Sequence, residues 1–308
     1  MNDPKSILDE LKKAVVGKDN VLIMALLAIL ARGHILLEDI PGVGKTTMAL
    51  AFSKTLGLEY HRVQFTPDVL PSDIVGFSLY DRESGQMTYK PGAILCNLFL
   101  ADELNRATSR TQSALLQAME EGVVTVDNHT YPVPQPFVVI ATQNPTGAKG
   151  TQMLPDSQMD RFMIRLSMGY PSHKDEIEMI RRKQKGINLE SVSQVVSRED
   201  MLRIRKESAQ VYISDDLLDY IVSLCEATRS HPQILQGASP RASLALSSLA
   251  KATAWIQGRD YVLPKDIRFI YSDCILHRLI WTQDTPDEAA KADVLSNIFA
   301  SVKAPGIR

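Results

Sequence analysis

The stretch EDIPGVGKTT, residues 38–47, decides how the rest of the chain is interpreted. It follows the short apolar run 34–37 and precedes MALAFSKTL, a segment with a helical pattern. Gly42 and Gly44 let backbone N–H groups turn inward around an anion, and the following helix presents its positive N-terminus to the same place. The stretch therefore predicts a phosphate-binding loop between a strand and a helix.

Consecutive residues of this loop are the predicted nucleotide contacts. Lys45 supplies a positive charge for the β- and γ-phosphates, and the Thr46 hydroxyl is a predicted ligand for Mg²⁺. One position departs from the general pattern G-x-x-x-x-G-K-[ST], because Asp39 stands where the first glycine is usual. The full set of predicted contacts in the loop is Pro41, Gly42, Val43, Gly44, Lys45, Thr46 and Thr47.

Two carboxylates follow the apolar strand expected at 98–101. Asp102 is predicted to hold Mg²⁺ through its water shell, since that ion prefers hard oxygen ligands and keeps several waters. Glu103 is predicted to orient and polarise the attacking water. Asn144, after another strand, could bridge the γ-phosphate and the water, but Asn-Pro at this position also favours a simple turn. From the residues alone, both interpretations of Asn144 stay open.

The hydrophobic pattern predicts an α/β domain followed by a helical one. Buried parallel strands are expected at 34–37, 60–64, 98–101 and 137–142, with a less regular fifth at 162–166. They are far enough apart for crossover helices, as in βαβ units. After Pro171 the pattern is almost entirely helical, and helices are expected at 173–185, 214–230, 240–257 and 264–276.

Two segments interrupt the alternation of strands and helices. Residues 65–92 are rich in Pro, Gly, Asp and Ser and are too long for a simple loop, which indicates a functional insertion. Residues 123–131 place β-forming residues on both sides of Asp127-Asn128 and predict a small hairpin.

Composition excludes several classes of function. The 34 Lys and Arg against 36 Asp and Glu, a net charge of −2, leave no basic excess for nucleic acid. The three cysteines are expected to be reduced core residues, and no His or Cys spacing predicts a transition-metal site. The longest apolar run, 21–31, is too short to cross a bilayer, and we expect a cytoplasmic protein with no membrane segment.

Five blocks of sequence, taken in order, resemble the MoxR family of AAA+ ATPases. The family tolerates Asp at the position of Asp39, and Leu104 replaces its usual Ile. The blocks are GHILLEDIPGVGKT (33–46), FLADELNRATSRTQSALLQAMEE (99–121), PFVVIATQNP (136–145), LPDSQMDRF (154–162) and GASPRA (237–242).

The resemblance implies a fold and a division of the chain. It implies a P-loop NTPase core of three αβα layers around a parallel sheet over residues 1–172, with the helix-two insertion at about 65–92 and a pre-sensor hairpin at about 123–131. A linker helix and a helical lid domain would follow over residues 173–308.

The resemblance also implies roles that spacing alone does not show. Arg161 matches the arginine finger that reaches the nucleotide of a neighbouring subunit, Arg241 the second sensor and Asn144 the first sensor. Val16 and Gly17 resemble the segment that packs against adenine. Without the family, Arg161 would be interpreted as a surface arginine and Arg241 as a first-turn helix residue bonded to nearby acids.

The expected function is that of a MoxR-type ATPase, which binds ATP and Mg²⁺ and remodels protein complexes as a chaperone-like ring, expected to be a hexamer. The family often works with a von Willebrand factor A domain partner, and no residue names the client protein. Two alternatives stay open, a nucleotide-gated binding scaffold with little turnover and a DNA-translocating motor. The sequence leaves undecided whether Arg241 acts on its own nucleotide, and what Arg106 and Arg110 do.

Overall fold

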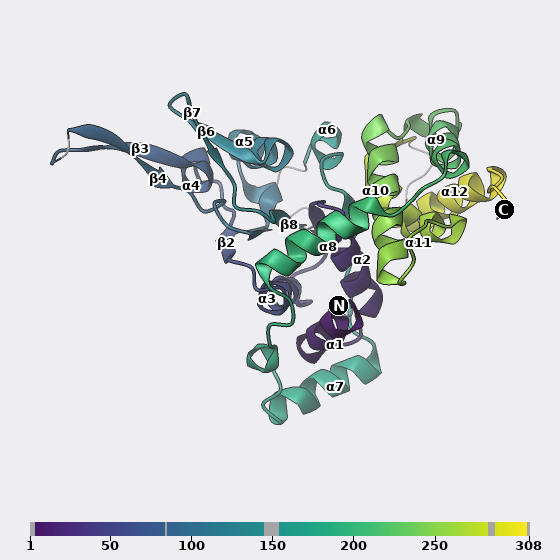
Figure 1. Ribbon diagram of the computed structural model, residues 1–308, viewed down its shortest axis with the longest axis horizontal. Coiled ribbons are helices and arrows are strands. Elements are labelled where there is room, and N and C mark those ends of the chain that lie inside the picture. Colours follow the sequence, from purple (N-terminus) through teal and green to yellow (C-terminus); the bar gives the residue numbers. More distant parts are fainter. Residues whose placement is uncertain (1–3, 84, 145–153, 283–286, 307–308) are drawn as a thin grey trace. The chain divides into compact units, whose positions relative to one another are not determined.

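A computed structural model describes residues 4–83, 85–144, 154–282 and 287–306 of the chain (Figure 1). The chain divides into two compact units. One consists of residues 1–23, 34–154 and 167–202, and the other of residues 24–33, 155–166 and 203–308. The domain boundary expected near residue 172 stays a prediction.

The first unit is built on a parallel sheet. Four of its strands lie in the order β2-β5-β8-β1, and their registers pair Gln64 with Asp102 and Glu38 with Gln143. Because the strands are parallel, their carboxyl ends meet at one edge of the sheet, which is where ligands bind in open α/β folds. The strands are β1 (Ile35–Glu38), β2 (Tyr60–Gln64), β5 (Leu98–Asp102) and β8 (Val138–Gln143).

Burial in this sheet follows strand position. Every residue of β5 and β8 is buried, as expected for parallel strands covered on both faces. The prediction that residues 60–64 form a buried strand is wrong, since β2 lies at the end of the strand order and its residues are half-buried or exposed. The irregular fifth run does form a strand, β9 (Ile164–Leu166), within the second unit.

Helices and short turns complete the first unit. In α5 the stripe Leu115, Leu116 and Met119 is buried, and the hydroxyl of Thr108 caps the first turn by accepting from the Thr111 N–H. Two helices, α2 (Asp19–Leu30) and α8 (Arg198–Gln210), contribute residues to both units. The others are α1 (Pro4–Ala14), α3 (Lys45–Thr55), η1 (Leu104–Arg106), α5 (Ser109–Glu121), α7 (His173–Gln184) and η2 (Leu189–Ser191).

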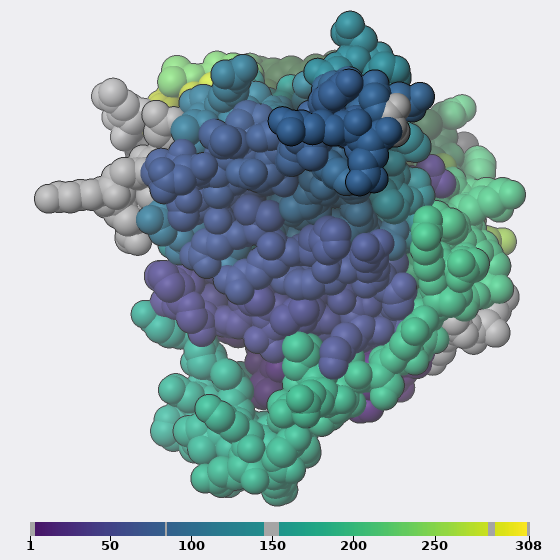
Figure 2. Space-filling model, turned by 90° about the vertical axis from the view of Figure 1, so that its left-hand side faces the viewer, coloured from purple at the N-terminus to yellow at the C-terminus, as the bar shows by residue number. Residues whose placement is uncertain are grey.

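The predicted insertion contains α4 (Pro71–Val75) and a hairpin of β3 (Gly76–Asp81) and β4 (Gln86–Pro91), which extends away from the sheet (Figure 1). The hairpin, dark blue in Figure 2, has four exposed large apolar side chains, those of Phe77, Leu79, Tyr80 and Met87.

The predicted second hairpin is also present, as β6 (Val123–Val126) and β7 (His129–Pro132). Its two turn residues, Asp127 and Asn128, both have positive φ, the conformation of a type I′ turn. The rings of Tyr89 and Tyr131 stack at 3.8 Å between centroids, so the two hairpins contact each other.

The second unit is largely helical, as predicted, and two serines cap its helices. Ser214 accepts from the Leu217 N–H at the start of α9, and Ser239 from the Arg241 N–H at the start of α10. The sequence pattern missed a small antiparallel pair, β10 (Ile234–Gln236) and β11 (Ile280–Trp281). The remaining elements are α6 (Asp156–Met159), α9 (Asp215–Arg229), α10 (Pro240–Ile256), α11 (Pro264–Ile275), η3 (Leu276–Arg278) and α12 (Glu288–Ser301).

Two further predictions concern the cysteines and membrane-spanning helices. Cys96, Cys225 and Cys274 are buried and unpaired, in agreement with reduced core residues. Within the described ranges, no helix has both the length and the apolar character needed to span a bilayer.

Candidate functional site

The loop between β1 and α3 adopts a conformation that depends on glycine. Gly42 and Gly44 have φ values of 86° and 99°, in the left-handed region that other residues avoid. Gly44 is also the N-cap of α3, so the helix begins at Lys45 directly after the turn. The first N–H groups of a helix lack partners within it, and together with the helix dipole they form an anion site.

A cavity of about 320 Å³ lies beside this loop, within the first unit. It brings together residues from four parts of the chain and combines glycine backbone with apolar side chains, a lining suited to a nucleoside. The predicted residues that line it are Val16, Pro41, Gly42, Val43, Gly44 and Thr47, and the lining that sequence reasoning missed includes Lys18, Met168, Tyr170, Pro171, Glu176 and Met179.

Gly17 does not line the cavity as its neighbour Val16 does, but it permits a close contact between two segments. It has a φ of 70°, and a Cβ atom placed on it would lie 2.2 Å from the Asp175 carboxyl carbon. Gly17 therefore allows the chain after α1 to approach the start of α7 closely.

The Lys45 ammonium is held over the end of the loop. Its Nζ donates to the Asp39 carbonyl at 2.8 Å and to the Asn144 side-chain oxygen at 3.4 Å. Burial lowers the pKa of Lys45, and the negative charges of Asp39, Asp102 and Glu103 partly oppose that shift. A buried ammonium among carbonyl oxygens is placed to exchange them for phosphate oxygens.

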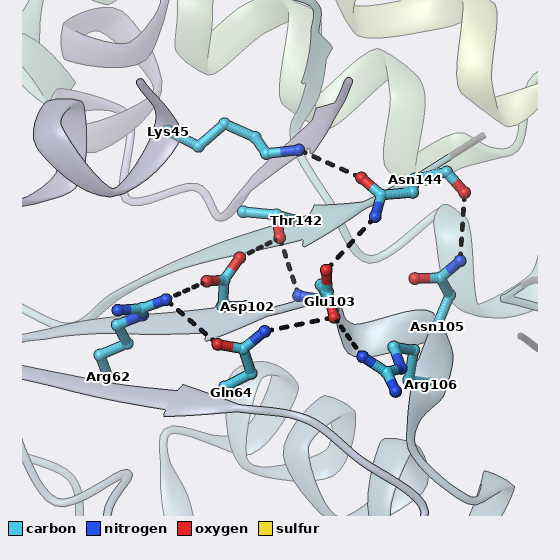
Figure 3. A network of polar contacts seen from close by, with 9 residues as sticks. All are labelled: Lys45, Arg62, Gln64, Asp102, Glu103, Asn105, Arg106, Thr142 and Asn144. Carbon is cyan, nitrogen blue, oxygen red and sulfur yellow. Dashed lines mark hydrogen bonds and ion pairs between the residues drawn. The ribbon is translucent and has the colours of Figure 1, made fainter. Parts of the chain in front are cut away.

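The Asp102 carboxylate has a partner on each oxygen (Figure 3). Oδ1 accepts from the Thr142 hydroxyl at 2.7 Å, and Oδ2 accepts from the Arg62 guanidinium at 2.7 Å. Arg62 is on β2, the strand next to β5, and sequence reasoning did not identify it. The carboxylate thus already holds a cation, which indicates that this position suits positive charge.

Glu103 follows β5 in a strained backbone conformation. Its φ of 57° and ψ of 46° are left-handed, which is uncommon for a residue other than glycine, and its N–H donates to the Thr142 hydroxyl at 2.8 Å. This turn separates its side chain from that of Asp102, so that the two adjacent carboxylates have different partners (Figure 3).

Three side chains surround the Glu103 carboxylate. Oε2 accepts from Arg106 at 2.8 Å and from Gln64 at 3.3 Å, and Oε1 accepts from the Asn144 amide at 3.4 Å. Arg106, whose role the sequence leaves undecided, pairs with Glu103 in the structure.

Asn144 connects the loop to this acid. Its side-chain oxygen accepts from Lys45 while its amide donates to Glu103, and its backbone carbonyl accepts from the Asn105 amide at 3.2 Å (Figure 3). The neutral amide therefore spans the positions predicted for the phosphate and the water. Pro145, which suggested the alternative of a simple turn, lies outside the described residues.

Asp39, in place of the usual glycine, has a definite structural role. Its carboxylate accepts from the Ser167 hydroxyl at 3.1 Å, from the Met168 N–H and from the Gly169 N–H at 3.0 Å. A glycine at this position could make none of these contacts.

Arg161 and Arg241 both belong to the second unit, and Asp160 links the segments that carry them. The Asp160 carboxylate accepts from the hydroxyl of Ser239, two residues before Arg241, at 2.8 Å. It also pairs with the guanidinium of Arg278, a side chain only 2% exposed. Asp160 thus connects the segment before β9 to the start of α10 and to η3 within the second unit.

We expect Asp160→Ala to lower the free energy of unfolding by about 3 kcal/mol, because it leaves the buried charge of Arg278 without its carboxylate. The measurement is the midpoint of urea denaturation. Glu288→Ala is the matched control, since it removes the carboxylate of the more exposed pair with Arg165 and should cost less than about 1 kcal/mol. Equal midpoints for the two variants would contradict this role of Asp160.

Comparisons of sequence with known proteins agree with this geometry. Residues 34–164 match the ATPase family associated with various cellular activities (AAA), and residues 226–298 match the AAA lid domain. The chain is 43% identical to the uncharacterized protein YeaC of Bacillus subtilis, covering 97% of this chain and 93% of that protein. It is 38% identical to chaperone MoxR1 of Mycobacterium tuberculosis (97% and 81% covered) and 31% identical to protein MoxR of Methylorubrum extorquens (96% and 93% covered).

A crystal structure gives a similar result. A Cytophaga hutchinsonii protein described as a candidate ATPase superposes with a TM-score of 0.90 at 40% identity, covering 98% of this chain and 94% of that one. The fold is therefore that of a AAA+ P-loop NTPase with a helical lid.

Proposed function

The chain belongs to the MoxR family of AAA+ ATPases, and on this premise we propose that it hydrolyses ATP, with Mg²⁺, to remodel other protein complexes. The observation that carries the proposal is the continuous path of contacts from Lys45 through Asn144 to Glu103. It joins a phosphate-binding loop to an acid that can activate water.

Nucleotide binding is assigned to the loop and the adjoining cavity. The backbone N–H groups of residues 42–47 and the Lys45 ammonium would hold the phosphates, while the cavity beside Val16 would take adenine. Gly17 supports the cavity from the chain that follows α1.

Catalysis is assigned to Glu103 and Asn144. Glu103 would accept a proton from the attacking water, and the Asn144 amide would keep that water in line with the γ-phosphate without adding charge. Arg106 and Gln64 both hold the Glu103 carboxylate, so they limit the directions in which it can accept that proton.

Thr46 and Asp102 fit a magnesium site. Hydroxyl and carboxylate oxygens are the hard ligands that this ion prefers, and Asp102 already pairs with a cation, Arg62. When bound, Mg²⁺ supplies positive charge to the β- and γ-phosphate oxygens. Thr142 would keep the carboxylate oriented by its hydrogen bond to Oδ1.

Arg161 and Arg241 are proposed to act in an assembled ring, expected to be a hexamer. An arginine delivered from a neighbouring subunit stabilises charge on the transferred phosphoryl group, so assembly would activate hydrolysis. Arg241 would contact nucleotide from the lid.

The remodelling role is supported by the name of a relative, chaperone MoxR1, and by the exposed apolar side chains of the β3–β4 hairpin. Such a surface suits contact with another protein. We propose a client protein, a von Willebrand factor A domain partner and a cytoplasmic location, without nucleic acid as a substrate.

We expect Lys45→Ala to lower the affinity for ATP about a hundredfold, because the triphosphate loses a charge-assisted partner at a buried position. Calorimetric titration with ATP and Mg²⁺ measures the affinity, and phosphate release measures turnover. Lys54→Ala is the matched control on the same helix, since the Lys54 side chain is exposed and donates to the Leu189 carbonyl.

Unchanged ATP affinity in Lys45→Ala would contradict the assignment of the loop. Binding without phosphate release by the assembled wild-type protein, with or without a partner, would favour the scaffold alternative. Stimulation of phosphate release by DNA would favour the motor.

A further inference from the structure

The backbone between β9 and α7, residues 167–171, forms part of the cavity wall. Met168, Tyr170 and Pro171 line the cavity directly. We call this segment the strap. It contributes no side chain to the path from Lys45 to Glu103, so its relevance to the site depends on what holds it in place.

Asp39 holds the strap from the side of the phosphate loop. Its side chain is only 5% exposed, and its carboxylate accepts from Ser167, Met168 and Gly169. A carboxylate accepting several N–H and O–H donors in a buried place is a strong and directional contact.

Lys18, directly before α2, holds the same segment through the carbonyl groups of the strap. Its ammonium donates to the Gly169 carbonyl at 3.2 Å and to the Tyr170 carbonyl at 2.9 Å. The strap thus has its N–H groups on a carboxylate and its C=O groups on an ammonium. Two opposite charges fix the backbone at the position where it lines the cavity.

Asp39 also touches the phosphate side of the site, because its backbone carbonyl accepts from Lys45. This second contact uses the backbone, so it persists when the side chain is changed. The phosphate loop can therefore keep its lysine partner while the strap loses its anchor. The two ends of the site are separable by mutation.

We propose that Asp39 is a positioning residue for the nucleoside end of the bound nucleotide, acting through the strap. The proposal rests on the function above, in that the ligand is an adenine nucleotide. It explains what replaces the first glycine of the loop pattern, namely a residue that couples the loop to the wall of the base pocket. The hydrogen bond from Lys45 goes to the Asp39 backbone carbonyl and not to its carboxylate.

The test compares ligands with and without a nucleoside. Calorimetry with Mg²⁺ measures the affinities of ATP, ADP and inorganic tripolyphosphate for the wild-type chain and for Asp39→Gly, which restores the common loop pattern. We expect the affinities for ATP and ADP to fall about tenfold, because charge-assisted hydrogen bonds to the strap are lost. The affinity for tripolyphosphate should change by less than about twofold.

Two further variants keep the test independent of folding in Asp39→Gly. Asp39→Asn keeps the shape but removes the charge, and Lys18→Met releases the strap from its carbonyl side. Both variants should weaken the binding of ATP and ADP more than the binding of tripolyphosphate. Lys12→Met is the control, since the Lys12 ammonium pairs with the exposed carboxylate of Asp19 and not with a residue of the strap.

Two results would overturn the proposal. If these variants lost affinity for ATP and for tripolyphosphate equally, Asp39 would act on the phosphates and not on the nucleoside. If Asp39→Asn and Lys18→Met bound ATP as tightly as the wild type, the strap would have no part in binding. Failure of the proposed function differs from both, because the wild-type protein would then not bind ATP.

Discussion

Glu103→Gln is expected to bind ATP with nearly wild-type affinity and to hydrolyse it about 10²- to 10⁴-fold more slowly, the usual contribution of a positioned general base. The substitution keeps the length and shape of the side chain while removing its ability to take a proton. Binding should persist because Lys45 and the loop remain intact. Titration with ATP and single-turnover phosphate release measure the two quantities separately.

The structure provides a control for this prediction. Glu120 is an exposed glutamate on α5, so Glu120→Gln makes the same chemical change away from the Glu103 carboxylate. The rate of phosphate release by Glu120→Gln should stay within about twofold of the wild-type rate, as expected for a surface substitution. If Glu103→Gln hydrolysed ATP at the wild-type rate, Glu103 would not be the general base.

Much of this site could be predicted because its residues are consecutive or lie at strand ends. The loop from Pro41 to Thr47 is local in sequence, and Asp102 and Glu103 directly follow an apolar run. Parallel strands bring their carboxyl ends to one edge, so the placement of Asn144 near these acids follows from the strand assignments alone.

Other parts could not be predicted because they depend on strand order. Arg62 and Gln64 reach Asp102 and Glu103 only because β2 pairs with β5, and no local pattern states which strands are neighbours. The same order makes β2 an edge strand, which explains why its residues are half-buried or exposed although the pattern predicted a buried strand. Periodicity reports local structure, whereas edge position is a property of the assembled sheet.

The cavity beside the phosphate loop is lined by segments that lie far apart in the sequence. Met168 and Tyr170 line the cavity with Val16, and Asp39 reaches the strap from far away in sequence. The unusual Asp39 was the one available signal, since a carboxylate in a glycine position needs donors. Its partners could not be identified without the structure.

Arg161→Ala is expected to leave ATP affinity nearly unchanged and to lower hydrolysis in the assembled protein about 10³-fold or more, the usual effect of removing an arginine finger. The reason is that this arginine would act on the nucleotide of a neighbour, after binding. Size-exclusion chromatography with ATP establishes that assembly is retained. Arg203→Ala, at an exposed arginine of the same unit that pairs with Glu207, is the control.

Mixing two inactive variants tests action between subunits. In a ring, each active site would combine Glu103 of one subunit with Arg161 of the next, across a head-to-tail interface. An Arg161→Ala subunit keeps Glu103, and a Glu103→Gln neighbour keeps Arg161, so a mixed ring contains complete sites. With random mixing, about a quarter of the sites are complete, and hydrolysis should return to about that fraction of the wild-type rate.

The mixture separates this mechanism from its rivals because each variant alone is inactive. If Arg161 acted on its own nucleotide, every subunit in the mixed ring would lack one of the two groups and no activity would return. If Arg161 only supported folding, its variant would lose ATP binding as well as turnover. Recovery in the mixture together with retained binding is therefore expected only when the arginine crosses from one subunit to the next.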